Sequence, residues 1–386
     1  MLYRELGKTG EKVSNLGFGC MRFPTLDNDP DRIDEAKALP MLRRAIDQGV
    51  NYIDTAYPYH GTGMDQPGAS EPFVGRVLRD GYRKKVHLAT KLPVWLARER
   101  ADMDRLLDAQ LQRLETDVID FYLLHSLDIR RWKTLEALGV TEFLDSALKN
   151  GKIRYAGFSF HDSLESFLPI VEGYDWSFCQ IQYNFLDESF EAGKSGLQYA
   201  AGEGLGIIVM EPLRGGSLAT CPEEARKIYD TYGGKRTPAE WALRWVWNHP
   251  EVSTVLSGMT EMSQLDENLQ IAAKASPNSM SPHELEIIRE VTDIYREKIP
   301  VGCTACRYCM PCEDGVNIPV ALQIYIDYHM FDDEISQARN KWRYNLVLPP
   351  ESRASACTEC GKCKERCPQH IDIPNELKKV AAVFGS

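Results

Sequence analysis

One strand–helix–strand unit sets the pattern for most of this chain: VIDFYLLH (118–125), VTEFLDSALKNG (140–151) and IRYAGFS (153–159). A short apolar run bounded by polar residues is typical of a buried strand, and the amphipathic stretch between the two runs is typical of a helix. Strands joined through a helix pair in parallel, with a right-handed crossover. The unit therefore predicts an α/β fold built on parallel strands.

Further runs of the same kind bring the number of expected strands to eight, with helical patterns between them. Eight such units close into a (β/α)8 TIM barrel of roughly 250 residues or more. An open doubly wound sheet is the alternative, and we rank it lower because the count is eight and no GxGxxG occurs early. Residues 2–14 suggest a small hairpin over the barrel floor. The other runs are VSNLGFG (13–19), VNYIDT (50–55), VHLATKL (86–92), FCQIQYN (178–184), GIIVMEP (206–212) and VSTVLSG (252–258).

The composition changes near residue 299, where the strand–helix alternation ends and cysteine motifs begin. We therefore expect a barrel over residues 1–298 and a small α-helical domain over residues 299–386. Two helices that open with proline, IPVALQIYIDYHMFDD (318–333) and IPNELKKVAAVF (373–384), each follow a cysteine motif. The tail thus repeats one unit, a cysteine motif and then a helix.

The net charge and the absence of long apolar runs exclude several classes of protein. A net charge of −11 repels phosphate backbones and anionic lipid, so we expect neither nucleic acid nor a membrane as a partner. No apolar run approaches the ~18–20 residues that span a bilayer. The opening MLYRELGKTGEK has no apolar signal segment, so we expect a soluble cytoplasmic protein. In that reducing compartment, eight clustered cysteines indicate metal rather than disulfides.

Polar residues stand at the ends of successive expected strands: Asp54, Lys91 and His125, with Tyr57 and Tyr59 just beyond the first. In a TIM barrel the active site lies at these carboxyl ends. A tyrosine hydroxyl can protonate the alkoxide formed when a carbonyl accepts hydride, and a lysine ammonium lowers the pKa of that hydroxyl. Asp54 would orient Lys91, and His125 would donate a hydrogen bond to the carbonyl oxygen. Taken alone, each residue could also have a purely structural role: Asp54 in a turn at the strand end, Lys91 as a solvated lysine and His125 as a core histidine.

Residues 1–298 resemble the aldo-keto reductase superfamily. The resemblance implies NADH or NADPH as cofactor and a catalytic tetrad of Asp54, Tyr59, Lys91 and His125. Tyr59 is preferred over Tyr57 because the family places its tyrosine five residues after the aspartate. The matching segments are GVNYIDTAYPYHG (49–61), ATKLP (89–93), FYLLH (121–125), GFS (157–159), QIQYN (180–184) and SGMTEMSQLDENL (257–269).

The same resemblance implies a set of cofactor contacts. Ser159 and Gln180 would hold the nicotinamide carboxamide, with Met210 where the family often has an aromatic residue. Phe160 and His161 stand where the family usually has asparagine after the serine. The pyrophosphate and adenosine would be held by Leu213, Arg214, Gly215 and Gly216 in one loop and by Ser257, Gly258, Gln264, Glu267 and Asn268 in another.

These departures bear on the choice of nucleotide. Gln264 replaces the arginine that often grips the 2′-phosphate of NADP, and Glu261 and Asp266 lie nearby. Acidic residues there disfavour NADPH, so we lean to NADH. A barrel that binds flavin remains open.

The second cysteine motif has the spacing of bacterial ferredoxins, Cys357-x2-Cys360-x2-Cys363-x3-Cys367 followed by Pro368. Zinc sites usually take four ligands as two separated pairs, so this run favours [4Fe-4S]. The first motif is one residue shorter at its last step and lacks the proline. By the crossing rule of two-cluster ferredoxins, the ligand sets are Cys303, Cys306, Cys309 and Cys367 for one cluster, and Cys357, Cys360, Cys363 and Cys312 for the other. A single cluster is the alternative.

Together the two parts predict an NAD(P)H-dependent oxidoreductase that reduces a small-molecule carbonyl, an aldehyde or ketone, to an alcohol. Nicotinamide exchanges two electrons at once and a cluster exchanges one, so direct coupling is difficult. One alternative is an iron–sulfur protein whose barrel binds flavin or another redox partner and exchanges electrons with a ferredoxin or another carrier. Another is a barrel that serves only as a cofactor-sensing scaffold. Lysine and arginine within the motifs would offset the cluster charge or dock an acidic carrier: Arg307, Lys362, Lys364 and Arg366.

Overall fold

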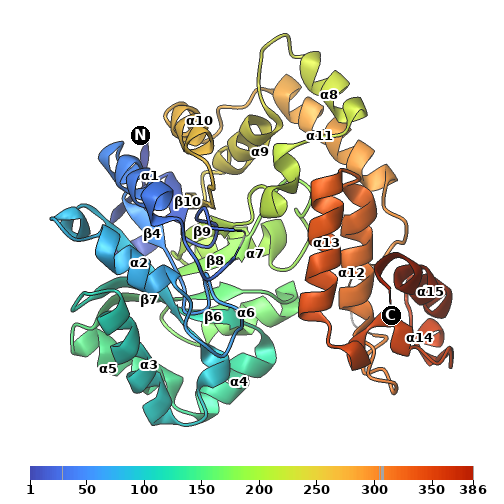
Figure 1. Cartoon of the computed structure of the whole chain (residues 1–386), viewed down its shortest axis with the longest axis horizontal. Helices are drawn as coiled ribbons and strands as arrows, with labels where there is room; N and C mark the ends of the chain where they lie inside the picture. The colour runs from blue at the N-terminus through green and yellow to red at the C-terminus, as the bar shows by residue number, and fades with distance from the viewer. Residues whose placement is uncertain (28, 304, 306–307, 386) are drawn as a thin grey trace. The chain divides into compact units, whose positions relative to one another are not determined.

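The computed structural model describes residues 1–27, 29–303, 305 and 308–385 (Figure 1). By internal contacts the chain divides into two compact units. The first unit combines Met1–Gly215 with Ala239–Met280, and the second combines Gly216–Pro238 with Ser281–Ser386. The second unit thus draws on two separate stretches of the chain.

The first unit is a closed barrel of eight parallel strands, which confirms the predicted (β/α)8 fold. The strands follow one another around the barrel in chain order, and β10 closes it by pairing with β3. Each expected apolar run forms one strand. The strands are β3 Leu16–Gly19, β4 Tyr52–Asp54, β5 His87–Leu92, β6 Ile119–Leu127, β7 Ile153–Phe160, β8 Phe178–Gln182, β9 Gly206–Met210 and β10 Val252–Ser257.

Helices that surround the barrel begin with local caps. The Asp34 carboxylate accepts a hydrogen bond from the Lys37 amide at the start of α1, and capping boxes open α3 and α10. The helices of this unit are α1 Glu35–Asp47, α2 Ser70–Val77, α3 Arg100–Arg113, α4 Ile129–Ala137, α5 Val140–Lys149, α6 Leu164–Glu172, α7 Gly193–Gly202, α9 Pro238–Trp247 and α10 Met262–Ala272.

A short antiparallel hairpin, β1 Tyr3–Glu5 and β2 Lys12–Ser14, closes the amino-terminal end of the barrel, as expected. Its Leu6 and Val13 are fully buried and join a cluster of strand residues inside the barrel. Burying side chains of this size stabilises the fold by about 1.5–3 kcal/mol each. A Cβ on Gly206, the first residue of β9, would lie 2.5 Å from the Leu6 side chain, so the close approach requires glycine. The hairpin leaves the opposite, carboxyl end of the strands for polar residues.

The second unit is helical. The helices α12 Ile318–Met330 and α15 Ile373–Phe384 confirm the two proline-opened helices. The internal contacts also place α11 Pro282–Glu297 in this unit. The expected boundary near residue 299 instead assigns α11 to the barrel, and that boundary stays a prediction. The Tyr295 hydroxyl on α11 donates to the Thr220 carbonyl oxygen at 3.3 Å, in the inserted stretch. The remaining α-helices of the unit are α8 Glu223–Asp230, α13 Glu334–Val347 and α14 Lys362–Glu365.

The helix α13 was not expected from the sequence. It buries Ser336, Asn340 and Tyr344 and leaves the apolar Ile335 and Trp342 79% and 63% exposed. Its inward face is therefore mostly polar, which reverses the usual pattern of an amphipathic helix.

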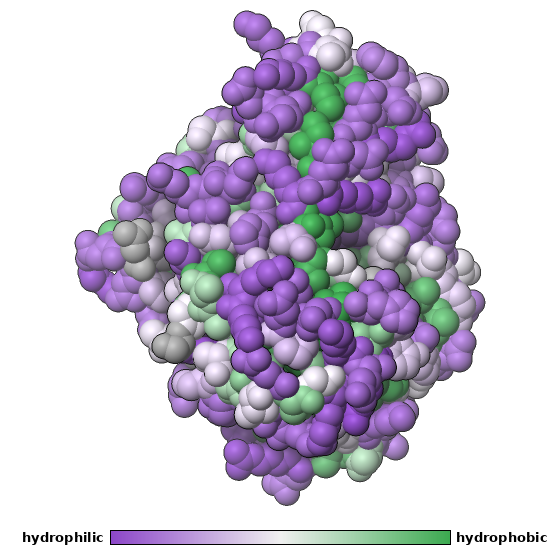
Figure 2. All heavy atoms as spheres, turned by 90° about the vertical axis from the view of Figure 1, so that its right-hand side faces the viewer, coloured by the Kyte–Doolittle hydropathy of each residue, from purple (hydrophilic) through white to green (hydrophobic). Residues whose placement is uncertain are grey.

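The side of the molecule that carries the C-terminal helices is mostly hydrophilic, with a narrow band of hydrophobic residues across it (Figure 2). Among the residues that the structure describes, no helix is both long and apolar enough to span a bilayer.

Candidate functional site

Three of the predicted catalytic residues lie on neighbouring strands at the carboxyl end of the barrel. Asp54 ends β4, Lys91 lies near the end of β5 and His125 lies in β6. These strands pair in parallel in that order, so the three side chains share one end of the barrel. All three are at least nine-tenths buried, which is rare for charged residues unless they are paired.

The Lys91 ammonium is at the centre of this group. Its Nζ donates to Asp54 Oδ1 at 2.5 Å, to the Thr55 carbonyl oxygen at 3.0 Å and to Tyr59 Oη at 3.3 Å. An ammonium has three protons to donate, and each finds an acceptor here. The arrangement fixes the position of the charge relative to the phenol oxygen.

The two candidate tyrosines are placed differently. Tyr59 lies against Lys91, whose Nζ is also 4.8 Å from the centre of its ring. Tyr57 instead donates to the Asp65 carbonyl oxygen at 3.3 Å, and its ring lies beneath the Arg113 guanidinium. The geometry therefore supports the choice of Tyr59.

The pKa shifts in this group differ in part from our expectation. Burial raises the pKa of Tyr59 above its ordinary value of 10.0, and the Lys91 ammonium only opposes that shift; we expected the ammonium to dominate. Burial disfavours the charged form of Lys91, yet Asp54 and Tyr59 together raise its pKa above 10.5. At neutral pH the group therefore holds a protonated phenol beside a charged ammonium.

His125 completes the group. Its ring centre lies 6.2 Å from that of Tyr59 and 5.3 Å from that of Trp95. Burial, followed by the charge of Lys91, holds its pKa well below 6.5. The imidazole is therefore neutral at physiological pH. Its Nδ1 is buried and has no hydrogen-bond partner among the described residues.

The residues expected to hold the nicotinamide lie on the next strands. Ser159 Oγ on β7 accepts from the Ser126 amide at 2.8 Å, which leaves its own proton free to be donated. Gln180 Nε2 on β8 lies 3.4 Å from the Met210 sulfur at the end of β9. Its Oε1 is buried without a partner among the described residues. A buried amide oxygen without a partner in the protein can accept a hydrogen bond from a bound ligand.

The loop after β9 includes three residues expected to hold the cofactor: Leu213, Arg214 and Gly215. The Arg214 guanidinium pairs with Asp187, with 3.4 Å between Nη1 and Oδ1. Gly216, the next residue expected to contact the cofactor, belongs to the second unit. The Asn184 side chain has its hydrogen-bond partners within the first unit. Its amide nitrogen donates to the Asp187 carboxylate and to the Glu211 carbonyl oxygen.

The segment after β10 is held by side chains expected to bind the nucleotide. Asn268 Nδ2 donates to Ser257 Oγ at 3.0 Å, and Gly258 packs against the Arg22 side chain. Gln264 caps its own helix, since its Oε1 accepts from the Thr260 amide at 2.8 Å and from the Glu261 amide. Glu267 lies on the same helix, α10, and Asp266 pairs with Arg44 on α1 at 2.8 Å.

One acid–base pair near the barrel mouth had no clear signal in the sequence. His161 Nδ1, just after β7, lies 3.1 Å from Glu191 Oε1. The Glu191 carboxylate raises the pKa of His161 against the opposing effect of burial. Glu191 follows β8 in an irregular segment, so neither periodicity nor a motif marks it.

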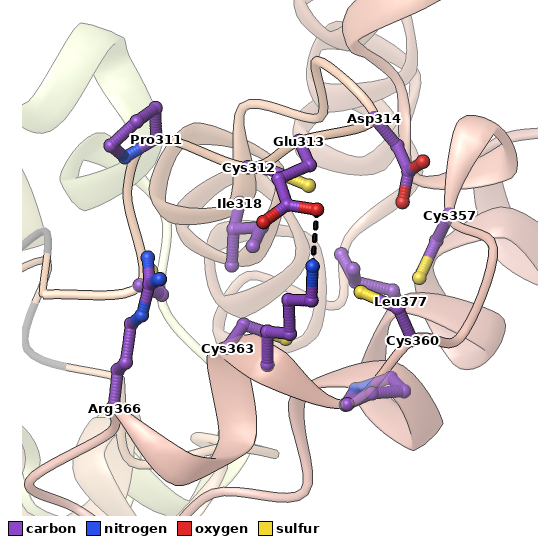
Figure 3. Close-up of a pocket in the computed structure, with 14 residues that line it drawn as sticks. Pro311, Cys312, Glu313, Asp314, Ile318, Cys357, Cys360, Cys363, Arg366 and Leu377 are labelled. Atoms are coloured by element: carbon purple, nitrogen blue, oxygen red, sulfur yellow. Dashed lines mark hydrogen bonds and ion pairs between the residues drawn. The ribbon is translucent and has the colours of Figure 1, made fainter.

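The cysteines of the second unit line two hollows. The first, of about 420 Å³, is lined by Cys312, Cys357, Cys360 and Cys363, and also by Cys309 (Figure 3). Four of these five cysteines form one of the two predicted ligand sets. The sulfur of Cys357 already accepts a hydrogen bond from the Glu359 amide at 3.4 Å, as cluster ligands commonly do.

The second hollow, of about 330 Å³, is lined by Cys303, Cys309 and Cys367. These are three of the four cysteines of the other predicted set. The fourth, Cys306, lies outside the described residues, as does Arg307. Cys367 comes from the second motif and Cys303 from the first, so the two motifs contribute to one hollow, as the crossing rule requires.

The arrangement of the sulfurs bears on the choice between a cluster and a single ion. Among the described residues, no three Cys, His, Asp or Glu side chains gather closely enough to hold one metal ion. Zinc would need its thiolates about 2.3 Å from one point. The described sulfurs instead line two hollows, and the spacing of the second motif is that of [4Fe-4S] sites.

Two family models match the chain, one over the barrel strands and one over the cysteine motifs. Residues 15–291 match the Aldo/keto reductase family, and residues 302–371 match the 4Fe-4S dicluster domain. A solved aldo-keto reductase from Bacillus halodurans, in its holo form, superposes with a TM-score of 0.61 at 26% identity. The match covers 75% of this chain and 96% of that one.

Two curated relatives are similar over the barrel. One is 6-dehydroglucose reductase of Novosphingobium aromaticivorans, 30% identical over 285 residues, which is 69% of this chain and 89% of the relative. The other is Protein tas of Escherichia coli, 27% identical over 327 residues, which is 70% of this chain and 92% of the relative.

Proposed function

Because the chain belongs to the aldo/keto reductase family and ends in a 4Fe-4S dicluster domain, we propose that it reduces an aldehyde or ketone to an alcohol with NADH or NADPH. One observation carries the proposal. The Lys91 ammonium bridges the Asp54 carboxylate and the Tyr59 hydroxyl inside a buried site at the carboxyl end of the barrel.

The nicotinamide supplies the hydride when it is bound. Tyr59 then donates its proton to the carbonyl oxygen, and the raised pKa of the phenol keeps that proton in place at neutral pH. Lys91 stabilises the phenolate that results, and Asp54 holds Lys91 charged and in position. The neutral His125 donates a hydrogen bond to the same oxygen and orients the substrate.

Several residues support a nicotinamide site. The free hydroxyl proton of Ser159 and the unpartnered Oε1 of Gln180 suit the two ends of a carboxamide. Gln264 in place of an arginine, with the acidic Glu261 and Asp266 nearby, favours NADH over NADPH. The name of the dehydroglucose reductase relative is consistent with a carbonyl substrate.

A second candidate function rests on the two cysteine hollows. In that function the barrel binds flavin or another redox partner, and the clusters exchange single electrons with a ferredoxin or another carrier. The complete tetrad favours the first function, because carbonyl reduction uses the proton donor that lies beside the buried ammonium.

The experiment compares Tyr59→Phe with Tyr57→Phe in the full chain, prepared anaerobically with its clusters. Oxidation of NADH and NADPH is followed with a panel of aldehydes and ketones. Loss of the general acid is expected to lower kcat about 10²–10⁴-fold in Tyr59→Phe. Tyr57→Phe is the matched control, because its hydroxyl donates to a loop carbonyl, that of Asp65, and not to the Lys91 group, and it should stay within about threefold of the wild type. Equal activity of the two variants would reject the proposal.

A further inference from the structure

The first turn of α2 carries two polar side chains that are completely buried, Ser70 and Glu71. A carboxylate is almost never fully buried unless it is paired, because removing it from water is costly. The reaction proposed above uses neither residue. Their hydrogen-bond partners therefore indicate why the fold keeps them inside.

The Glu71 carboxylate has three partners, and they lie beside the residue that carries the active-site ammonium. Its Oε1 accepts from Thr90 Oγ1 at 2.7 Å and from Gln110 Nε2 at 2.6 Å. Its Oε2 accepts from Arg113 Nε at 2.7 Å. Gln110 Nε2 also donates to the Lys91 carbonyl oxygen at 2.9 Å. Glu71 and Gln110 together thus hold the backbone of β5 at Thr90 and Lys91.

The orientation of the Gln110 amide is itself fixed. Tyr122 on β6 donates through its hydroxyl to Gln110 Oε1 at 2.7 Å, and both side chains are fully buried. An amide has one accepting end and one donating end, so this bond directs Nε2 toward Glu71 and Lys91. The network therefore ties α2 and α3 to the neighbouring strands β5 and β6.

Ser70 holds the other side of the active-site group. Its Oγ donates to the Cys20 carbonyl oxygen at 3.0 Å and lies 2.8 Å from Thr55 Oγ1. Its backbone amide donates to the Tyr59 carbonyl oxygen at 3.1 Å. The Thr55 carbonyl oxygen is in turn an acceptor for the Lys91 ammonium. Ser70 thus fixes the backbone of Tyr59 and the side chain of a residue that binds Lys91.

One helical turn therefore fixes both partners of the hydrogen bond between Lys91 and Tyr59. The distance from Nζ to Oη is 3.3 Å, and such a bond is lost beyond about 3.5 Å, so a small displacement of either partner would break it. We propose that Ser70 and Glu71 are positioning residues, which set the distance between the Lys91 ammonium and the Tyr59 hydroxyl. Their effect on rate rests on the proposed function, whereas their effect on the distance does not.

The experiment begins with Glu71→Gln in the full holo-protein. The change keeps the size of the side chain, but an amide nitrogen cannot accept a hydrogen bond, so at least one of the three bonds of Glu71 is lost. We expect kcat for carbonyl reduction to fall about 10- to 100-fold through misplacement of Lys91. The KM values should stay within about threefold, because a group that acts only on the chemical step leaves substrate binding unchanged. In a crystal structure of the variant, the distance from Nζ to Oη should exceed about 3.5 Å.

Asp120→Asn is the matched control. Asp120 is also a buried carboxylate, 4% exposed, and it pairs with the Arg83 guanidinium at 2.8 Å. It accepts from the Leu88 amide on β5 at 2.8 Å, near the amino end of that strand and away from Lys91. Both variants should therefore have lower melting temperatures than the wild type. Only Glu71→Gln should lose kcat, and Asp120→Asn should stay within about threefold of the wild type.

A second variant, Ser70→Ala, removes a single hydroxyl and decides the question if Glu71→Gln does not fold. It should lower kcat about tenfold and lengthen the same distance. The proposal is overturned if the folded variants keep the wild-type distance or the wild-type kcat, or if Asp120→Asn loses as much kcat as they do. A wild type that reduces no carbonyl compound would defeat the proposed function, and the distance in the variants would still decide the positioning role.

Discussion

Substitution of Lys91 by methionine tests the buried ion pair on which the candidate active site is built. Methionine keeps most of the volume of lysine, so the change removes the charge and the three hydrogen bonds but leaves the packing. The Asp54 carboxylate, only 2% exposed, then stays behind without a counter-ion.

The loss can be estimated from that burial. Removing one partner of a buried ion pair costs about 3–5 kcal/mol, because the other charge remains uncompensated. With a urea m-value of about 3 kcal/mol/M, this corresponds to a fall in the unfolding midpoint of about 1–1.7 M. Burial already raises the pKa of Asp54, and loss of the ammonium raises it further. A carboxyl with a raised pKa in the folded state stabilises the fold as pH falls, so the penalty should be smaller at pH 5 than at pH 8.

Tryptophan fluorescence in urea is the assay. Six of the seven tryptophans lie in the first unit, so the signal reports mainly on the barrel. The double variant Lys91→Met with Asp54→Asn removes both charges and should recover at least half of the lost stability. The reasoning is refuted if the single variant unfolds at the wild-type midpoint, or if adding Asp54→Asn makes it less stable still.

Two further predictions concern pH and cluster content. Since the pKa of Tyr59 lies above 10.0 and that of His125 well below 6.5, kcat/KM for carbonyl reduction should be nearly constant from about pH 6.5 to about pH 9.5 and fall only at higher pH, as the phenol loses its proton. A midpoint near pH 7 in the pH profile of the reduction would contradict this. Cys312→Ala should lower the iron content from about eight to about four atoms per chain and abolish one of the two cluster signals, whereas loss of all iron would argue against separate ligand sets.

The sequence predicted the barrel because every strand is an apolar run with its own boundaries. Each of these runs became one strand, and the polar residue at the end of the run fell where the fold places active sites. The helix α13 was not predicted, and the reason is physical. It buries Ser336 and Asn340 and exposes Ile335 and Trp342, so hydrophobic periodicity points to the wrong face.

Within the candidate site, the sequence predicted which side chains lie together but not their electrostatics. The resemblance to the family, which places its tyrosine five residues after the aspartate, indicated Tyr59, but the direction of its pKa shift depends on how deeply the phenol is buried. Likewise, the sequence shows Gln264 where an arginine is common, but only the structure shows that its amide oxygen caps a helix. The partners of Arg214 and His161 are also distant in the chain, and no local pattern marks them.

Residues 216–238 fold with residues 281–386 although the last part of the barrel unit lies between them in the chain. The backbone therefore passes between the two units three times rather than once. No single proteolytic cut can release the cysteine-bearing unit whole: a cut near residue 280 leaves α8 attached to the barrel fragment, and a cut near residue 215 carries β10 away with the helices. Separating the two halves of this protein for study thus calls for redesigned chain ends, because no single truncation point leaves both units whole.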